Sequence, residues 1–88
     1  MREVVAVEVE GFTIRYFRTE GEVHLCDATS KHAYGVAATK YIGDKEEESV
    51  DAGLISEDEG YVDELITILS KNTVTPAVLC EMLDEMLC

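Results

Sequence analysis

The spacing of apolar residues changes near Asp27, and this change constrains the fold more than any other feature of the chain. Residues 3–9 and 12–17 alternate apolar with polar side chains, as half-buried strands do. A Gly-containing pair between them predicts a tight turn, and residues 19–21 predict a second turn before a short strand at 22–26. We therefore expect a three-stranded antiparallel meander in the first third of the chain.

After Asp27 the apolar residues recur at helical spacing. Asp27 or Thr29 can cap a helix that runs toward Tyr34 and stops at Gly35. Residues 36–42 resume the helical pattern, which Gly at the next position ends. This stretch therefore predicts one helix with a break, or two short helices.

Two further helices are predicted after a charged segment at residues 44–49, which we interpret as a loop or the first turn of a short helix. A helical pattern opens at Glu59 or Gly60 and ends near residues 70–72. The pair Thr75–Pro76 is typical of a helix start, and an apolar stripe follows it. Strands followed by helices predict an α+β fold, in which a three-stranded antiparallel N-terminal meander is followed by three or four helices packed on one face.

A chain of 88 residues has room for one domain with a modest core. We divide this single domain, residues 1–88, into a strand-rich part at 1–26 and a helical, strongly acidic part at 27–88. An apolar content of 47% excludes an intrinsically disordered chain. The predicted core consists of the apolar positions on the inner faces of these elements: Val5, Val7, Phe12, Ile14, Val23, Leu25, Leu65, Ile66, Leu69, Leu79, Leu83 and Leu87.

The chain has the composition of a cytoplasmic protein. No apolar run approaches the roughly 20 residues that span a bilayer, and no charged-then-apolar leader opens the sequence. Cys26, Cys80 and Cys88 are odd in number and lack paired spacing, which favours free thiols in a reducing compartment.

Negative charge is concentrated in the second half of the chain. Residues 1–42 carry six acidic and five basic side chains, a net of −1, whereas residues 43–88 carry thirteen acidic and two basic ones, a net of −11. These values account for the −12 of the whole chain. So uneven a distribution indicates a surface that either meets a basic partner or repels nucleic acid and anionic membrane.

The acidic side chains lie off the predicted apolar stripes, and carboxylates one helical turn apart sit about 5–6 Å from each other. That spacing is close to the repeat of phosphates along a nucleic-acid strand, so a row of carboxylates can imitate a nucleic-acid backbone. The alternative is a solvated face that only keeps the protein soluble. The predicted partner-binding residues are Glu46, Glu47, Glu48, Asp51, Glu57, Asp58, Glu59, Asp63 and Glu64.

The candidate metal ligands do not form a recognisable site. His24, Cys26 and Asp27 lie close together, with His32 nearby and Cys80 far along the chain, but paired-ligand spacing is absent. No orienting acid or oxyanion donor accompanies a Cys–His pair, and no Gly-rich phosphate loop is present. We therefore expect neither a metal, a cofactor nor an enzyme.

Two other patterns predict contacts. The last helix has a wide apolar face, and Val78, Met82 and Met86 on it are candidates for homodimer formation. In the first half, basic residues alternate with aromatic ones, a pattern that could contact phosphates and stack bases, although the net charge opposes it. This second set is Arg15, Arg18, Lys31 and Lys40 with Tyr16, Phe17, Tyr34 and Tyr41.

Residues 12–42, about a third of the chain, resemble the start of KilA-N and Bro-N type modules of phages and large viruses. Those modules open with a short strand pair, a Gly-containing turn and a strand, followed by a helix start and a Gly–aromatic pair. The matching residues are Ile14–Arg15, Gly21–Glu22, Val23, Asp27–Ala28 and Tyr34–Gly35. The resemblance implies a phage regulatory DNA-binding module, and the acidic second half departs from that pattern.

The predicted function is that of a small acidic inhibitor or adaptor that occludes the basic surface of a nucleic-acid-handling protein. Phage anti-defence proteins, anti-CRISPR proteins among them, are the class that this character suggests, in which case the location is the host cytoplasm. The alternatives are the DNA-binding module and a homo-oligomeric accessory protein whose acidic face is solubilising.

Overall fold

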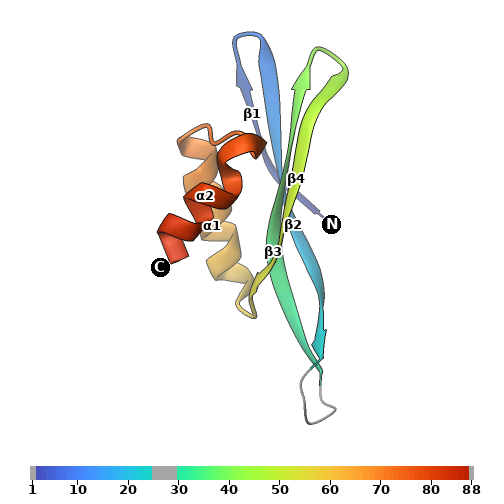
Figure 1. Cartoon of the computed structure of the whole chain (residues 1–88), viewed down its shortest axis with the longest axis vertical. Helices are drawn as coiled ribbons and strands as arrows, with labels where there is room; N and C mark the ends of the chain where they lie inside the picture. Colours follow the sequence, from blue (N-terminus) through green and yellow to red (C-terminus); the bar gives the residue numbers. More distant parts are fainter. Residues whose placement is uncertain (1, 25–29, 88) are drawn as a thin grey trace.

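The computed structural model describes residues 2–24 and 30–87, and in these ranges the chain forms four strands and two helices. The strands are β1 (Arg2–Val9), β2 (Phe12–His24), β3 (Ser30–Ile42) and β4 (Lys45–Ser56). They form an antiparallel sheet in the order β1-β2-β3-β4. The helices α1 (Glu59–Lys71) and α2 (Pro76–Leu87) pack on one face of this sheet and leave the other face without a helix (Figure 1).

The prediction of three strands and three or four helices was wrong, because the segment predicted to be helical is β3. Its residues Ala33, Val36, Ala37, Ala38 and Thr39 are all buried, so β3 is buried on both faces. A strand buried on both faces reads as a continuous apolar run and does not alternate. The predicted helix starts at Asp27 and Thr29 lie outside the described residues.

β4 begins in the charged segment at residues 44–49, which was interpreted as a loop or the first turn of a short helix. It lies at the edge of the sheet, where charged residues such as Lys45 and Glu46 are common because they discourage edge-to-edge aggregation. The strand-rich part of the chain therefore extends to Ser56, well beyond residue 26. The predicted turn at residues 19–21 was also wrong, because β2 continues without a break to His24. Residues 22–24 are in a strand as predicted, but they are the end of β2 and not a separate strand.

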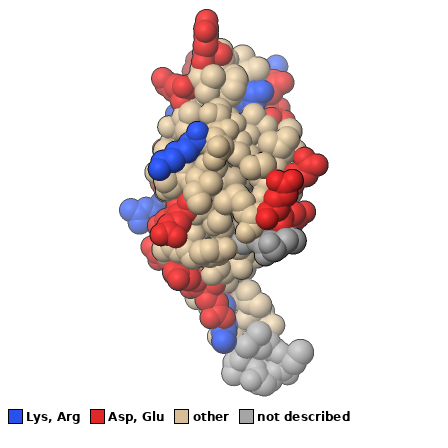
Figure 2. Space-filling model, turned by 90° about the vertical axis from the view of Figure 1, so that its left-hand side faces the viewer, with Lys and Arg blue, Asp and Glu red and all other residues tan. Residues whose placement is uncertain are grey.

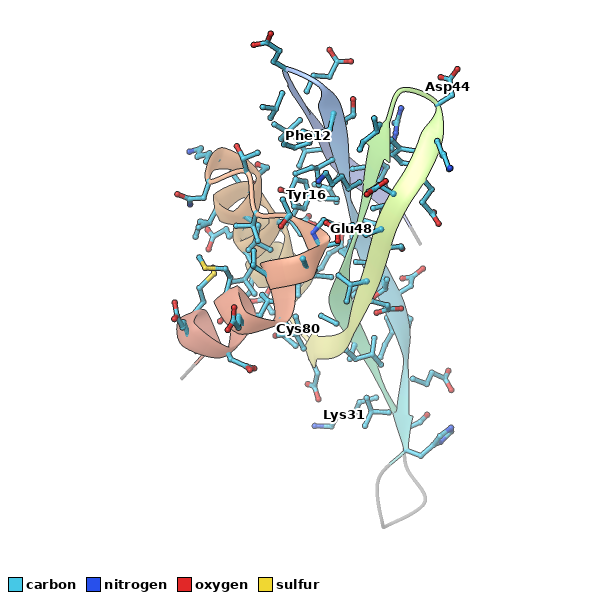
Figure 3. All side chains as sticks on the ribbon, turned by 45° about the horizontal axis from the view of Figure 1, so that its top comes forward. Phe12, Tyr16, Lys31, Asp44, Glu48 and Cys80 are labelled. Atoms are coloured by element: carbon cyan, nitrogen blue, oxygen red, sulfur yellow. The ribbon has the colours of Figure 1, made fainter. Side chains whose placement is uncertain are left out.

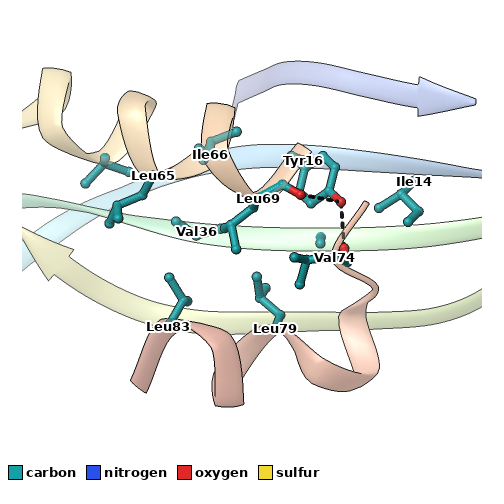
Figure 4. Packing of buried hydrophobic residues seen from close by; sticks show 11 residues of the cluster. Ile14, Tyr16, Val36, Leu65, Ile66, Leu69, Val74, Leu79 and Leu83 are labelled. Atoms are coloured by element: carbon teal, nitrogen blue, oxygen red, sulfur yellow. Dashed lines mark hydrogen bonds between the residues drawn. The ribbon is translucent and has the colours of Figure 1, made fainter. Parts of the chain in front are cut away.

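The core lies between the helix-bearing face of the sheet and the two helices (Figure 4). Six predicted core residues are buried: Ile14, Leu65, Ile66, Leu69, Leu79 and Leu83. Val5, Val7 and Phe12 are half-buried against this cluster. Prediction missed the core members Tyr16, Val36, Ala38, Val62 and Val74.

Val23 was wrongly placed in the core and is 40% exposed. The helices cover only the middle of the sheet, and the β2–β3 hairpin extends past them at one end (Figure 1). Val23 lies on that extension, paired with Lys31. Leu25 and the side chain of Leu87 lie outside the described residues.

Tyr16 connects β2 to the segment between the helices. Its hydroxyl donates a hydrogen bond to the Val74 carbonyl oxygen at 2.6 Å and has a longer contact of 3.4 Å with the Leu69 carbonyl oxygen (Figure 4). Burial raises the pKa of Tyr16 from its ordinary value of 10.0 to about 12. The folded protein is therefore more stable when the Tyr16 phenol is neutral than when it is ionised.

Alkaline titration should reveal Tyr16 as a late-titrating tyrosine. Its contribution to folding is complete below pH about 10 and declines as the pH rises from about 10 toward 12. Tyrosinate absorbance in wild type and Tyr16→Phe checks this, because the variant should lose the last titration step. At neutral pH the variant should be about 1–2 kcal/mol less stable, since buried carbonyl groups lose a donor. A late step that persists in the variant would contradict the assignment.

Candidate protein-binding surface

The nine predicted acidic residues fall into separate groups along β4 and α1. The hairpin carboxylates, which we define as Glu46, Glu47 and Glu48, lie at the start of β4 beside the β3–β4 turn. The helix carboxylates, which we define as Glu57, Asp58, Glu59, Asp63 and Glu64, lie around the start of α1. Residues 49–56 of β4 separate the two groups, so Glu48 and Glu57 are roughly 30 Å apart at the rise of a strand, with Asp51 between them. The carboxylates therefore do not form one continuous row.

Two helix carboxylates bind Arg18, which projects from β2 toward α1. Its Nη1 atom lies 2.8 Å from both carboxylate oxygens of Asp63 and 3.2 Å from Glu59 Oε1. The side chain of Arg18 is only 11% exposed, and its guanidinium lies 5.6 Å from the centre of the Tyr34 ring. The hydrogen bond to Asp63 is the main reason that the pKa of Arg18 is raised further. Asp63 and Glu59 therefore hold α1 against the sheet.

Two more helix carboxylates have local contacts. Asp58 is the N-cap of α1, and its Oδ1 accepts a hydrogen bond from the Tyr61 backbone N–H at 3.2 Å. Glu57 Oε1 lies 3.5 Å from Lys31 Nζ, and both side chains are exposed. Of this group, Asp58, Glu59 and Asp63 have clear structural roles.

Among the described residues, the hairpin carboxylates have no such structural contacts. None of the three forms an ion pair with another residue in the described ranges 2–24 and 30–87. Glu46 lies opposite Tyr41, and Glu48 lies opposite Lys40, with a register shift between these pairs. Tyr41 and Lys40 are on opposite faces of β3, so the carboxylates project on both sides of the edge strand. Figure 3 shows this end of the sheet, with Asp44 at the turn and Glu48 on β4.

The acidic side chains also leave much of the helix-bearing side uncharged. Figure 2 looks onto that side: uncharged residues occupy most of its centre, and Asp and Glu gather along its two margins. Negative charge therefore surrounds this side and does not form a single plane on it.

The basic and aromatic residues do not form one surface. Arg15 lies 2.6 Å from Glu3 Oε1, with its guanidinium 5.8 Å from the centre of the Tyr41 ring. Arg15 projects from the face without helices, whereas its neighbours Tyr16 and Arg18 project toward the helices. Tyr16 is fully buried and cannot stack on a base. The structure thus separates the residues that a nucleic-acid interface would need to bring together.

The candidate metal ligands are also separated. His24 is exposed near one end of β2, and His32 Nε2 lies 3.0 Å from Glu20 Oε2. This hydrogen bond is the main reason that the pKa of Glu20 lies below its ordinary value. Cys80 is exposed on α2, while Cys26 and Asp27 lie outside the described residues. Within the described ranges no three His, Cys, Asp or Glu side chains are grouped to hold a metal.

The residues predicted for self-association share one helix but not one environment. Val78 is 40% exposed, whereas Met82 and Met86 are half-buried against the core. Homodimer formation through α2 stays a prediction.

Two hollows lie at the C-terminal end of β4, and sequence reasoning did not identify them. The first, of about 200 Å³, is bordered by β2, β3 and β4. The second, of about 290 Å³, lies between β4 and α2. Leu54 and Ile55 line both. Figure 3 shows Cys80, which lines the second hollow, on α2 beside this end of β4.

The chain was compared with known families, curated proteins and solved structures. A family model described as "Family of unknown function (DUF6514)" matches residues 1–88. The chain belongs to this family. No curated protein and no solved structure matches the chain.

Membership of the DUF6514 family leaves the KilA-N and Bro-N resemblance a prediction, since the matched family is a different one.

Within the described residues, no helix is long and apolar enough to cross a membrane.

The Arg18 contact and the two hollows could not be found by local pattern reading. Arg18 and Asp63 are 45 positions apart, and each reads as an ordinary surface charge on its own element. The available signal was the pair Leu54–Ile55, two adjacent large apolar residues in an acidic stretch.

Proposed function

We propose that this chain is a small acidic protein-binding module, an inhibitor or adaptor that occupies the basic surface of a nucleic-acid-handling protein in the cytoplasm. The observation that carries the proposal is the group of three hairpin carboxylates at an exposed end of the sheet, with no basic partner among residues 2–24 and 30–87. By contrast, Glu59 and Asp63 are paired with Arg18, and Asp58 caps α1. The hairpin carboxylates have no comparable structural role.

The physical mechanism is electrostatic occlusion. A net charge of −12 attracts a basic surface over a distance set by the Debye length, about 8 Å at physiological salt. Because a register shift separates Glu46 from Glu48, the hairpin carboxylates face both sides of the edge strand and can meet Lys and Arg side chains that otherwise hold phosphates. Such a complex competes with nucleic acid for the same basic residues. A phage anti-defence protein, including an anti-CRISPR protein, would act in this way.

Two alternatives receive less support. Direct DNA binding needs a basic surface, and the basic residues are divided between two faces of the sheet. A self-assembling accessory protein would be held by apolar contact through α2, with the hairpin carboxylates serving only solubility. On α2, however, Met82 and Met86 are half-buried against the core, and of the three candidate residues only Val78 is exposed.

Removal of the hairpin charges should abolish capture of basic partners. At low salt, the immobilised wild type should capture nucleic-acid-binding proteins from host lysate. The triple variant Glu46→Gln/Glu47→Gln/Glu48→Gln should capture about tenfold less of these proteins, or less still. Each single charge contributes little at a rim, so the triple variant is required. Mass spectrometry of the captured proteins, with and without competing DNA, is the measurement.

The matched control removes three exposed carboxylates elsewhere. Glu8→Gln/Glu10→Gln/Glu22→Gln has the same net charge as the hairpin variant and should retain the partners. Reversal of Glu57, Asp58 and Glu59 is a poorer test, because Asp58 caps α1 and Glu59 contacts Arg18. Equal capture by wild type and the hairpin variant would refute the proposed function.

A further inference from the structure

β4 is a free edge of the sheet along its whole length. Only β3 pairs with it, and no backbone hydrogen bond from outside the sheet reaches it within the described residues. An edge strand exposes backbone donors and acceptors that can bind an extended segment of another chain. The Gly53 N–H is already bonded to Asp51 Oδ1 at 2.9 Å, so the available stretch begins at Leu54.

The two hollows lie on opposite sides of this stretch. Leu54 pairs with Gly35 on the face without helices, and its Cδ1 lies 3.4 Å from where a Cβ of Gly21 would be. Ile55 and Ala52 pack against the core on the helix-bearing face. An extended chain directs successive side chains to opposite faces. Two adjacent apolar residues of a docked segment would therefore enter one hollow each.

Charged residues border both hollows. Asp84 lines the second hollow, whereas Glu57 lines the first together with Lys31, whose Nζ lies 3.5 Å from Glu57 Oε1. The start of the same strand carries the hairpin carboxylates. The interior of each hollow is formed by apolar side chains, chiefly Leu54, Ile55 and, in the second, Leu83. The complementary ligand is apolar at its centre and basic where it meets Asp84 and the hairpin carboxylates.

We propose that the free edge of β4 at Leu54–Ser56 binds an extended segment of the partner in which two adjacent apolar residues are flanked by Lys or Arg. This inference rests on the proposed function, because it specifies how the basic partner is recognised. A second copy of this chain is a poor occupant. β4 has four acidic residues against one basic residue, so two β4 edges would place like charges side by side.

Two capped peptides of identical composition test the proposal. The first has two adjacent leucines between arginines and lysines, and the second has the leucines separated by one residue, so that both project from the same side. Fluorescence anisotropy should show the first binding about tenfold or more tightly, because only it can fill both hollows. Equal affinities, or no binding of the first peptide, would overturn the proposal.

A pair of substitutions locates the binding site on the protein. Leu54→Glu and Val78→Glu each add one carboxylate at a position that is 41% or 40% exposed, but only Leu54 lines the hollows. Leu54→Glu should bind the first peptide about tenfold more weakly than Val78→Glu does, although their charges are equal. Circular dichroism checks that both variants are folded. Equal binding by the two would show attraction by charge alone, which refutes this inference and leaves the proposed function standing.

Cys80 gives a direct readout at the second hollow. In a Cys26→Ser/Cys88→Ser background, the first peptide should slow alkylation of Cys80, and the second should slow it less.

Sedimentation tests whether a second copy of this chain binds the edge instead. A wild-type dimer that Leu54→Glu dissociates would assign this edge to a second copy and overturn the proposal. Retention of lysate partners by the hairpin variant would instead refute the proposed function, independently of these peptide measurements.

Discussion

Replacement of Gly35 with alanine should destabilise the domain by about 3 kcal/mol, which lowers the melting temperature by roughly 12–24 °C for a chain of this size. Gly35 lies in the middle of β3, where β4 changes register twice. A Cβ on Gly35 would overlap the carbonyl oxygen of Gly53 and lie 2.8 Å from Thr19 Oγ1. Because the nearest obstacle is backbone, a rotamer change cannot relieve the overlap, and the two strands must separate.

Gly21→Ala is the matched control for this substitution. The nearest atom to its new Cβ is a methyl group of Leu54 at 3.4 Å, at the end of a flexible side chain. We expect a change of less than about 1 kcal/mol, within the range of ordinary surface substitutions. Chemical denaturation of both variants is the measurement. A Gly35→Ala protein as stable as the Gly21→Ala protein would contradict the close approach of β3 and β4.

Gly35 also shows why β3 was misread from the sequence. A glycine after an aromatic residue was interpreted as the stop of a helix, whereas its role is to let β4 approach β3. That role depends on Gly53, eighteen positions away, whose backbone has a positive φ of 82°. Close approach between two strands has no local sequence pattern, so the helical interpretation could not be rejected.

Elements with local signals were predictable. The turn before Phe12, the end of α1 at Lys71 and the start of α2 at Pro76 lie where capping and turn residues indicated. β3 and β4 were not predictable. β3 is buried on both faces and so lacks the alternation of a strand, and β4 carries the charges of an edge strand.

The candidate surface was predictable only in part. Composition indicated that carboxylates are exposed, and the hairpin carboxylates are indeed exposed or half-buried. Which carboxylates the fold uses for itself depends on contacts such as that of Arg18 with Asp63, which join β2 to α1. Such contacts are decided by tertiary packing, so a list of acidic residues cannot separate structural carboxylates from those left for a partner.

Truncation of Leu69 should strongly destabilise the domain. Leu69 is fully buried on α1 and packs in the cluster that contains Tyr16, Val36 and Val74 (Figure 4). Leu→Ala changes in cores cost about 2–5 kcal/mol because they remove apolar burial and leave a cavity. A domain of this size has about 5–10 kcal/mol of stability in total, so Leu69→Ala should remove about a fifth or more of it.

The neighbouring residue provides the control. Ile68 is on the same helix but 46% exposed, so Ile68→Ala also replaces an apolar residue with a better helix former but does not open a core cavity. We expect Ile68→Ala to remain within about 1 kcal/mol of wild type, and Leu69→Ala to unfold at a much lower urea concentration with a similar denaturant slope. The same comparison tests the orientation of α1. If α1 were rotated so that Ile68 faced the sheet, Ile68→Ala would be the less stable of the two variants. That result would also contradict the contact between Asp63 of α1 and Arg18 of β2.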